Sequence, residues 1–103
     1  MKWDALDSFL ADFKRIKVPE HRERFRHAVR DINAAFDAAG DPGIPVFPAH
    51  LRVKPVQGAP GIYELTWSFA GPDGRATFEF VQIEGELAIC WRRIGDHSIF
   101  DRP

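Results

Sequence analysis

Two apolar stripes with helical spacing occupy the first forty residues. Apolar side chains that recur every three or four residues fall on one side of a helix. The first stripe contains Trp3, Leu6, Phe9, Leu10 and Phe13, and the second contains Phe25, Ala28, Val29, Ile32, Phe36 and Ala39. Pro19 suits the first turn of the second helix and Gly40 its C-terminal cap. The short link at residues 16–18 predicts an antiparallel helical hairpin.

A segment rich in proline and glycine, residues 40–50, separates the helical pattern from an alternating one. Proline and glycine disfavour both helix and central strand, so this segment is expected to be a loop. Beyond it, apolar and polar residues alternate with a period of two, which is typical of half-buried strands. The expected strands are 51–54, 62–69, 75–81 and a last strand that runs from about residue 87 into Arg92 and Arg93. Turns are expected at 58–61, 71–74 and 84–85.

The order of these elements predicts an α+β fold in a single domain over residues 1–103. An N-terminal antiparallel two-helix hairpin would pack on one face of an antiparallel meander of about four strands. The opposite face of the sheet would be polar. By alternation it carries Arg52, Lys54, Glu64, Thr66, Arg75, Thr77 and Glu79, with one of Arg92 and Arg93.

Composition narrows the class of protein. No segment approaches the length of about 18 apolar residues needed for a membrane span, and the N-terminus lacks the apolar core of a signal peptide. The single cysteine, Cys90, excludes an internal disulfide and is expected to be a small buried side chain. These features favour a cytoplasmic protein with no membrane partner. The formal net charge of −1 counts against nonspecific nucleic-acid binding, so any such affinity must come from local placement of charge.

The richest chemistry lies near the end of the sequence, where Arg92 and Arg93 are followed by His97 and Phe100. Arginine binds phosphate bidentately and stays charged, whereas histidine can transfer a proton near neutral pH. The combination suggests work on a phosphodiester, with His97 as general acid or base. The alternative is an ordinary surface histidine. Phe100 lies beyond the last strand and would either stack on a base or cover the edge of the core.

Several basic residues are candidates for binding phosphate. They are Arg52, Lys54, Arg75, Arg92 and Arg93. The alternative is cross-strand ion pairing with Glu64 and Glu79. Only one of the two adjacent arginines can share the polar face unless a β-bulge intervenes. On the second helix, Arg22, Arg26 and Arg30 recur at intervals of four; a solvated helix face is favoured over contact with RNA.

Three segments, taken in order, resemble RelE-type toxins. Residues 51–67 resemble their "Lys, x, Leu, x, Gly, two or three residues, Tyr/Trp, Glu, Leu, Arg" stretch. Residues 74–80 look like their "Arg, apolar, x, aromatic" strand, and residues 91–100 are similar to the closing "Arg, x, Gly, Thr/Ser, His, x, x, Phe" segment of the RelE/YafQ-like branch. Many members open with a strand before the first helix, whereas here the stripe that begins at Trp3 predicts a helix from the start.

This resemblance implies a type II toxin: a ribosome-dependent mRNA endonuclease, neutralised by a cognate antitoxin, that uses no metal or other cofactor. The RNA 2′-hydroxyl attacks the adjacent phosphate while an acid protonates the leaving 5′-oxygen. The matching positions give His97 as acid or base, and Phe100 as the aromatic beside the substrate base. Lys54, Arg75 and Arg92 or Arg93 would stabilise the phosphate charge. Arg52 is expected to help bind the substrate.

Two rival functions remain open. A ParE-like module would poison a DNA topoisomerase by protein contact and would not need a terminal histidine. A noncatalytic interaction domain would suit the near-neutral charge.

Overall fold

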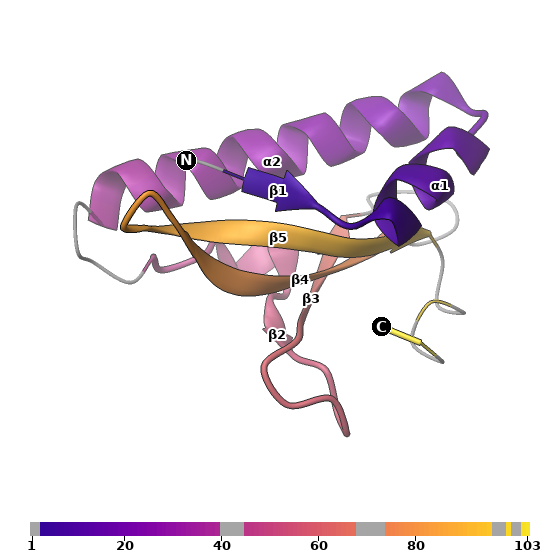
Figure 1. Ribbon diagram of the computed structural model, residues 1–103. Coiled ribbons are helices and arrows are strands. Elements are labelled where there is room, and N and C mark those ends of the chain that lie inside the picture. Colours follow the sequence, from indigo (N-terminus) through magenta and orange to yellow (C-terminus); the bar gives the residue numbers. More distant parts are fainter. Residues whose placement is uncertain (1–2, 40–44, 68–73, 96–98, 100–101) are drawn as a thin grey trace.

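The protein is an α+β fold with two helices and a five-stranded mixed open sheet, of order β1-β5-β4-β3-β2 (Figure 1). The computed structural model describes residues 3–39, 45–67, 74–95, 99 and 102–103, with the side chain of Trp67 excepted. The elements are β1 (Trp3–Ala5), α1 (Asp7–Arg15), α2 (Pro19–Ala39), the 3-10 turn η1 (Ala49–Leu51), β2 (Lys54–Pro55), β3 (Tyr63–Trp67), β4 (Gly74–Ile83) and β5 (Glu86–Gly95).

Strands β2 to β5 pair antiparallel in chain order, as the alternating pattern predicts. The turn at residues 84–85 is confirmed. Glu84 has φ 53° and Gly85 has φ 81°, the left-handed pair that joins two twisted strands in a tight hairpin. Residues 71–73 of the turn expected at 71–74 and the cap expected at Gly40 lie outside the described residues, and Gly74 begins β4.

The structure near the N-terminus shows that two predictions were wrong: the first helix does not begin at Trp3, and the sheet is not purely antiparallel. Trp3 does not begin a helix but starts β1, which lies parallel to β5 with Trp3 opposite Ile89 and Ala5 opposite Trp91. The Leu6 N–H donates to the Trp91 carbonyl oxygen at 2.9 Å, so α1 begins only at Asp7. β1 is stabilised by pairing with β5, which lies at the other end of the sequence. The local periodicity of apolar residues therefore does not predict it.

The strand predicted at residues 51–54 is also shifted along the chain. Leu51 ends η1, Arg52 adopts a left-handed conformation with φ 50°, and β2 consists of Lys54 and Pro55. Proline lacks the N–H that a central strand needs, but β2 is an edge strand and tolerates it.

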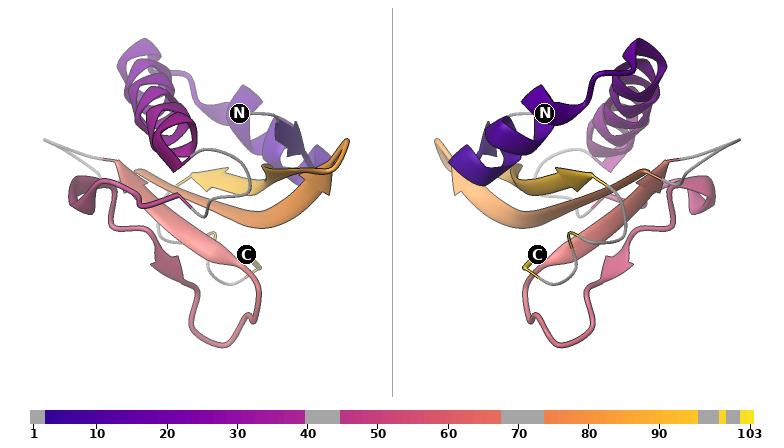
Figure 2. Two further views of the ribbon diagram at one scale, coloured as in Figure 1. Left: turned by 90° about the vertical axis from the view of Figure 1, so that its left-hand side faces the viewer. Right: turned by 90° about the vertical axis from the view of Figure 1, so that its right-hand side faces the viewer.

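Both helices lie on one face of the sheet (Figure 2), and α2 is the long helix that the second apolar stripe predicts. Between the helices and the sheet is an aromatic core. Trp91 lies with its ring 5.1 Å from Phe25, 5.6 Å from Phe78 and 5.8 Å from Phe9, centre to centre. Offset and edge-on rings at these distances add to the free energy of burying their area.

Candidate functional site

A polar row crosses the face of the sheet opposite the helices. Lys54 pairs with Glu64, Glu64 with Thr77, and Thr77 with Arg93. Residues opposite one another on neighbouring strands point to the same face, so the row joins β2 to β5. Arg75, two residues before Thr77 on β4, lies in the next row toward the end of the sheet.

A β-bulge settles the relation between the two adjacent arginines. Thr77 pairs with Arg93 but Phe78 pairs with Trp91, so Arg92 is an extra residue in β5. The Arg92 carbonyl oxygen, displaced from the ladder, accepts a hydrogen bond from the Ser8 hydroxyl of α1 at 2.7 Å. The bulge therefore lets both arginine side chains reach the C-terminal segment, of which residues 102 and 103 are described here, and strict alternation would not allow this.

Arg92 lies on the polar face of the sheet. One Nη of Arg92 is 3.4 Å from the Glu79 carboxylate, and its Nε donates to the Pro103 carbonyl oxygen at 3.1 Å. The Thr77 hydroxyl donates to the same oxygen at 3.1 Å. Thr77 is thus fully buried, although alternation places it on an outward face.

Arg93 joins the sheet to α1 through Asp12, which is buried. Arg93 Nε and Nη2 donate to the two Asp12 carboxylate oxygens at 2.5 and 3.2 Å, and the Ile94 N–H donates to one of them at 3.1 Å. The hydrogen bond to Asp12 raises the pKa of Arg93, and burial opposes it more weakly. The remaining Nη of Arg93 donates to the Arg102 carbonyl oxygen at 3.2 Å.

The two bulge arginines line one surface hollow of about 560 Å³, which we call the arginine hollow. Its lining consists of Ser8, Ala59, Ile62, Arg92, Arg93, Arg102 and Pro103. Three guanidinium-bearing residues around one hollow can bind an anion, because each offers a fixed fork of N–H donors.

The other predicted basic residues do not line this hollow. Lys54 lies three strands from β5, about 14 Å across the sheet, and its Nζ is 3.5 Å from a Glu64 carboxylate oxygen. Arg75 donates to the Gly74 carbonyl oxygen at 3.2 Å. The prediction that Arg52 shares a strand face with Lys54 is wrong, because Arg52 caps η1 and is exposed.

His97 and Phe100 lie outside the described residues, so their roles stay predictions. In sequence they follow Gly95, the last residue of β5, and flank Ile99, which is buried. Cys90 is buried as expected, and burial raises the pKa of its thiol, with the charges of Glu79 and Asp4 adding to the rise.

Sequence reasoning missed Asp12, Ser8 and Arg102. Asp12 could have been noticed in the sequence, because it lies between Phe9 and Phe13 on the buried side of the first apolar stripe. A carboxylate on a buried helix face requires a charged or hydrogen-bonding partner from elsewhere in the chain. Ser8 and Arg102 leave no such signal, because each acts through backbone carbonyls that only the bulge and the C-terminal segment position.

Over the described parts of the chain, no three His, Cys, Asp or Glu side chains are grouped so that they could hold a metal ion. Within the same residues, neither helix has the length and apolar character to cross a membrane. Comparisons with protein-family models, curated proteins and solved structures gave no match for this chain.

Proposed function

We propose that this protein is the toxin of a type II toxin–antitoxin system, a metal-independent endoribonuclease that cleaves mRNA on the ribosome in the cytoplasm. A cognate antitoxin would be its neutralising partner. The observation that carries the proposal is the arginine hollow, where a bulge aims Arg92 and Arg93 at one place on a polar sheet face.

The donors in the hollow suit a phosphodiester. Arg92 Nε already donates to the main-chain oxygen of Pro103, and Arg93 Nη1 to that of Arg102. Charge-assisted hydrogen bonds from guanidinium to phosphate oxygens are shorter and stronger than hydrogen bonds between neutral groups. Donors held in place before the reaction are most effective on the additional charge that develops as the 2′-hydroxyl attacks phosphorus. Lys54 and Arg75, farther along the same face, would contact flanking phosphates.

Proton transfer is assigned to His97, two residues beyond the strand that carries both arginines. His97 would accept the proton of the attacking 2′-hydroxyl or donate one to the leaving 5′-oxygen. Phe100 would stack on the neighbouring base. The family resemblance gains support from β1, because a strand before the first helix is common in RelE-type toxins and the apolar stripe alone argued against it.

Induced expression, with growth recorded and mRNA 5′ ends mapped in the same cultures, tests the proposal. We expect growth arrest with cuts inside translated messages, both lost in His97→Ala and Arg92→Ala and reduced in Arg75→Ala. Lys17→Ala, an exposed change in the link between the helices, is the matched control and should remain toxic. Arg93→Ala is avoided because it strands the buried Asp12 carboxylate and tests folding instead.

Other outcomes separate the rivals. Arrest with intact mRNA would support a topoisomerase poison of the ParE type. Normal growth with abundant folded protein would contradict both toxin functions and favour a noncatalytic interaction domain.

A further inference from the structure

An apolar groove, lined by other residues than the arginine hollow, lies beside the helices. It has a volume of about 350 Å³ and runs between α2 and the β1–α1 segment. The buried rings of Phe9, Phe25 and Trp91 line its deep part, while Trp3 and Leu10 border it on one side. Figure 2 shows α2 and the β1–α1 segment standing apart above the sheet.

Exposed apolar side chains gather at this groove. Among the described residues, five large hydrophobic side chains are exposed, and two of them, Trp3 of β1 and Leu10 of α1, line the groove. The ring of Trp3 borders the groove although the residue is 59% exposed. Exposed apolar side chains at an apolar groove are typical of a protein-binding surface.

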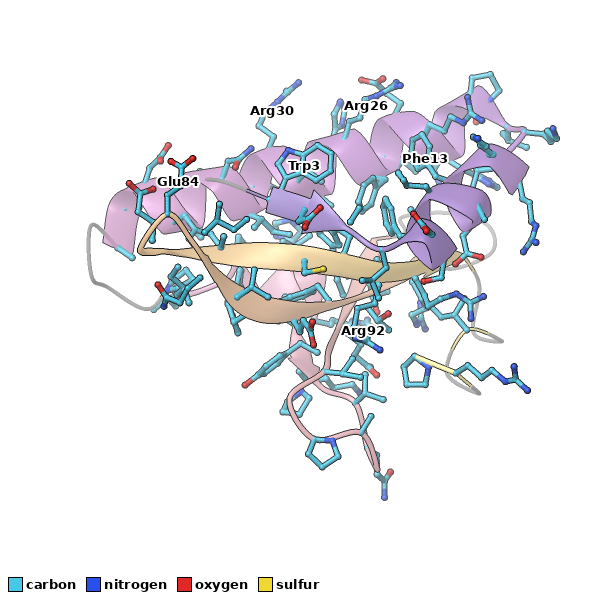
Figure 3. The ribbon with its side chains drawn as sticks, viewed as in Figure 1. Trp3, Phe13, Arg26, Arg30, Glu84 and Arg92 are labelled. Carbon is cyan, nitrogen blue, oxygen red and sulfur yellow. The ribbon has the colours of Figure 1, made fainter. Side chains whose placement is uncertain are left out.

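The α2 side of the groove has one lining arginine and a second arginine one turn along the helix. Arg26 lines it and Arg30 follows one turn later on α2, and both are exposed. Figure 3 shows these two arginines on α2 above Trp3. Arg26 has one exposed partner, Glu23 at 3.3 Å, and no ion pair joins Arg30 to any other residue that the structure describes. At the end of the groove, the Arg22 guanidinium lies 5.2 Å from the centre of the Phe13 ring.

Strand addition at β1 is disfavoured as the mode of binding. The Ala5 N–H donates to the Asp4 carboxylate at 2.8 Å, which occupies a donor of this edge strand. The groove has a helix as one wall and offers rings and aliphatic side chains, which suits the apolar face of a second helix.

We propose that this groove binds an amphipathic helix of a partner protein, with apolar residues toward Trp3 and Leu10 and acidic residues toward Arg26 and Arg30. The charge of the α2 wall selects an acidic helix over a basic one. This inference is independent of the proposed nuclease activity, because it uses none of the residues of the arginine hollow.

The test uses the whole chain and two synthetic helical peptides of about four turns. Both carry Leu at every third or fourth position; one has Glu along the flank of the Leu stripe and the other has Lys there. Binding is measured by calorimetry and by the indole NMR signal of Trp3, assigned with Trp3→Phe. The groove variants are Leu10→Asp and the double reversal Arg26→Glu/Arg30→Glu. Their matched controls are Val46→Asp, at an 88% exposed site away from the groove, and Lys17→Glu.

We expect the Glu peptide to shift the Trp3 indole signal and to bind at least about tenfold more tightly than the Lys peptide, a difference of about 1.4 kcal/mol. Leu10→Asp should weaken binding about tenfold, the double reversal should invert the peptide preference, and both controls should bind normally. The proposal is overturned if Trp3 does not respond to the Glu peptide, or if groove and control variants bind alike. Concentration-dependent self-association through Trp3 would also overturn it, in favour of a second copy of this chain.

Discussion

Phe78 and Thr77 are neighbours on β4, both fully buried, and they are buried in different ways. Phe78 points to the helices and packs among aromatic rings. Thr77 points to the polar face, where the C-terminal segment covers it and accepts its hydroxyl proton in a hydrogen bond. One face of the sheet is thus stabilised by apolar area and the other by a few directional contacts.

The difference shows where specificity and stability reside. Apolar area contributes to stability whatever the fine geometry, whereas each polar contact depends on a particular partner. Single changes on the polar face are therefore expected to cost less stability than the loss of a ring from the aromatic core. The predictions that follow compare the two faces, beginning with the largest expected effect.

Replacing Phe78 with Ala should lower the free energy of unfolding by about 4 kcal/mol, because it removes a ring at the centre of the core and leaves a cavity. Urea unfolding followed by circular dichroism measures this loss. Val46→Ala, at an exposed site, should change stability by less than about 0.5 kcal/mol. A loss below about 2 kcal/mol for the Phe78 variant would mean that the aromatic core is not the main contribution to the free energy of unfolding.

Replacing Asp12 with Ala should cost about 3 kcal/mol, because Arg93 and the Ile94 N–H would lose their buried partner. The same unfolding experiment applies. Arg15→Ala removes the exposed partner of Asp12, 3.5 Å away, and should cost less than about 1 kcal/mol. Equal losses for the two variants would show that the buried pair of Asp12 and Arg93 contributes no more to stability than the exposed pair of Asp12 and Arg15.

Replacing Thr77 with Val should cost about 1 kcal/mol, since the shape is kept and one hydrogen bond is lost while Arg92 still donates to Pro103. Thr66→Val is the matched change, because Thr66 is also buried and makes no side-chain hydrogen bond with the described residues. Thermal unfolding should rank Thr77→Val as the less stable of the two. The reverse order would contradict the role of the C-terminal cover.

The smallest effect concerns Cys90, whose pKa is raised in the folded protein mainly by burial. The folded state then holds the thiol proton more tightly than the unfolded state, so the free energy of unfolding falls as pH rises above about 8.5. Below that pH the contribution is constant. We expect Cys90→Ala to show a weaker decline between about pH 8 and pH 10, measured by urea unfolding at each pH. Parallel curves for the two proteins would contradict the raised pKa.

Local patterns predicted the long elements of the fold. The apolar stripe and Pro19 predicted α2, and alternation with Gly85 predicted the hairpin of β4 and β5. In these segments, helix or hairpin pairing within the segment agrees with the apolar pattern. The short strand β1 was missed, because its hydrogen bonds come from β5 at the far end of the chain.

The candidate site was predictable in its residue types and not in its geometry. The sequence identifies Arg92 and Arg93 as candidates for binding phosphate, but alternation allows only one of them to lie on the polar face. The bulge adds one residue to β5, so the alternation of side chains is shifted from Arg92 onward. Arg93 then donates hydrogen bonds to Asp12, and Arg92 pairs with Glu79. Arg52 shows the opposite error, since a left-handed residue removes it from a strand that alternation had assigned.

The sequence by itself determined the α+β class, the helix α2, the antiparallel order of β2 to β5 and the positions of Lys54 and Arg75 on the sheet. These depend on the period of apolar residues and on turn chemistry, which act over a few neighbours. Only the tertiary structure decided the parallel strand β1, the buried partner of Arg93 and the convergence of Arg92, Arg93 and Arg102 on one hollow. Each of these joins residues distant in sequence, and its free energy arises only when the whole chain has packed.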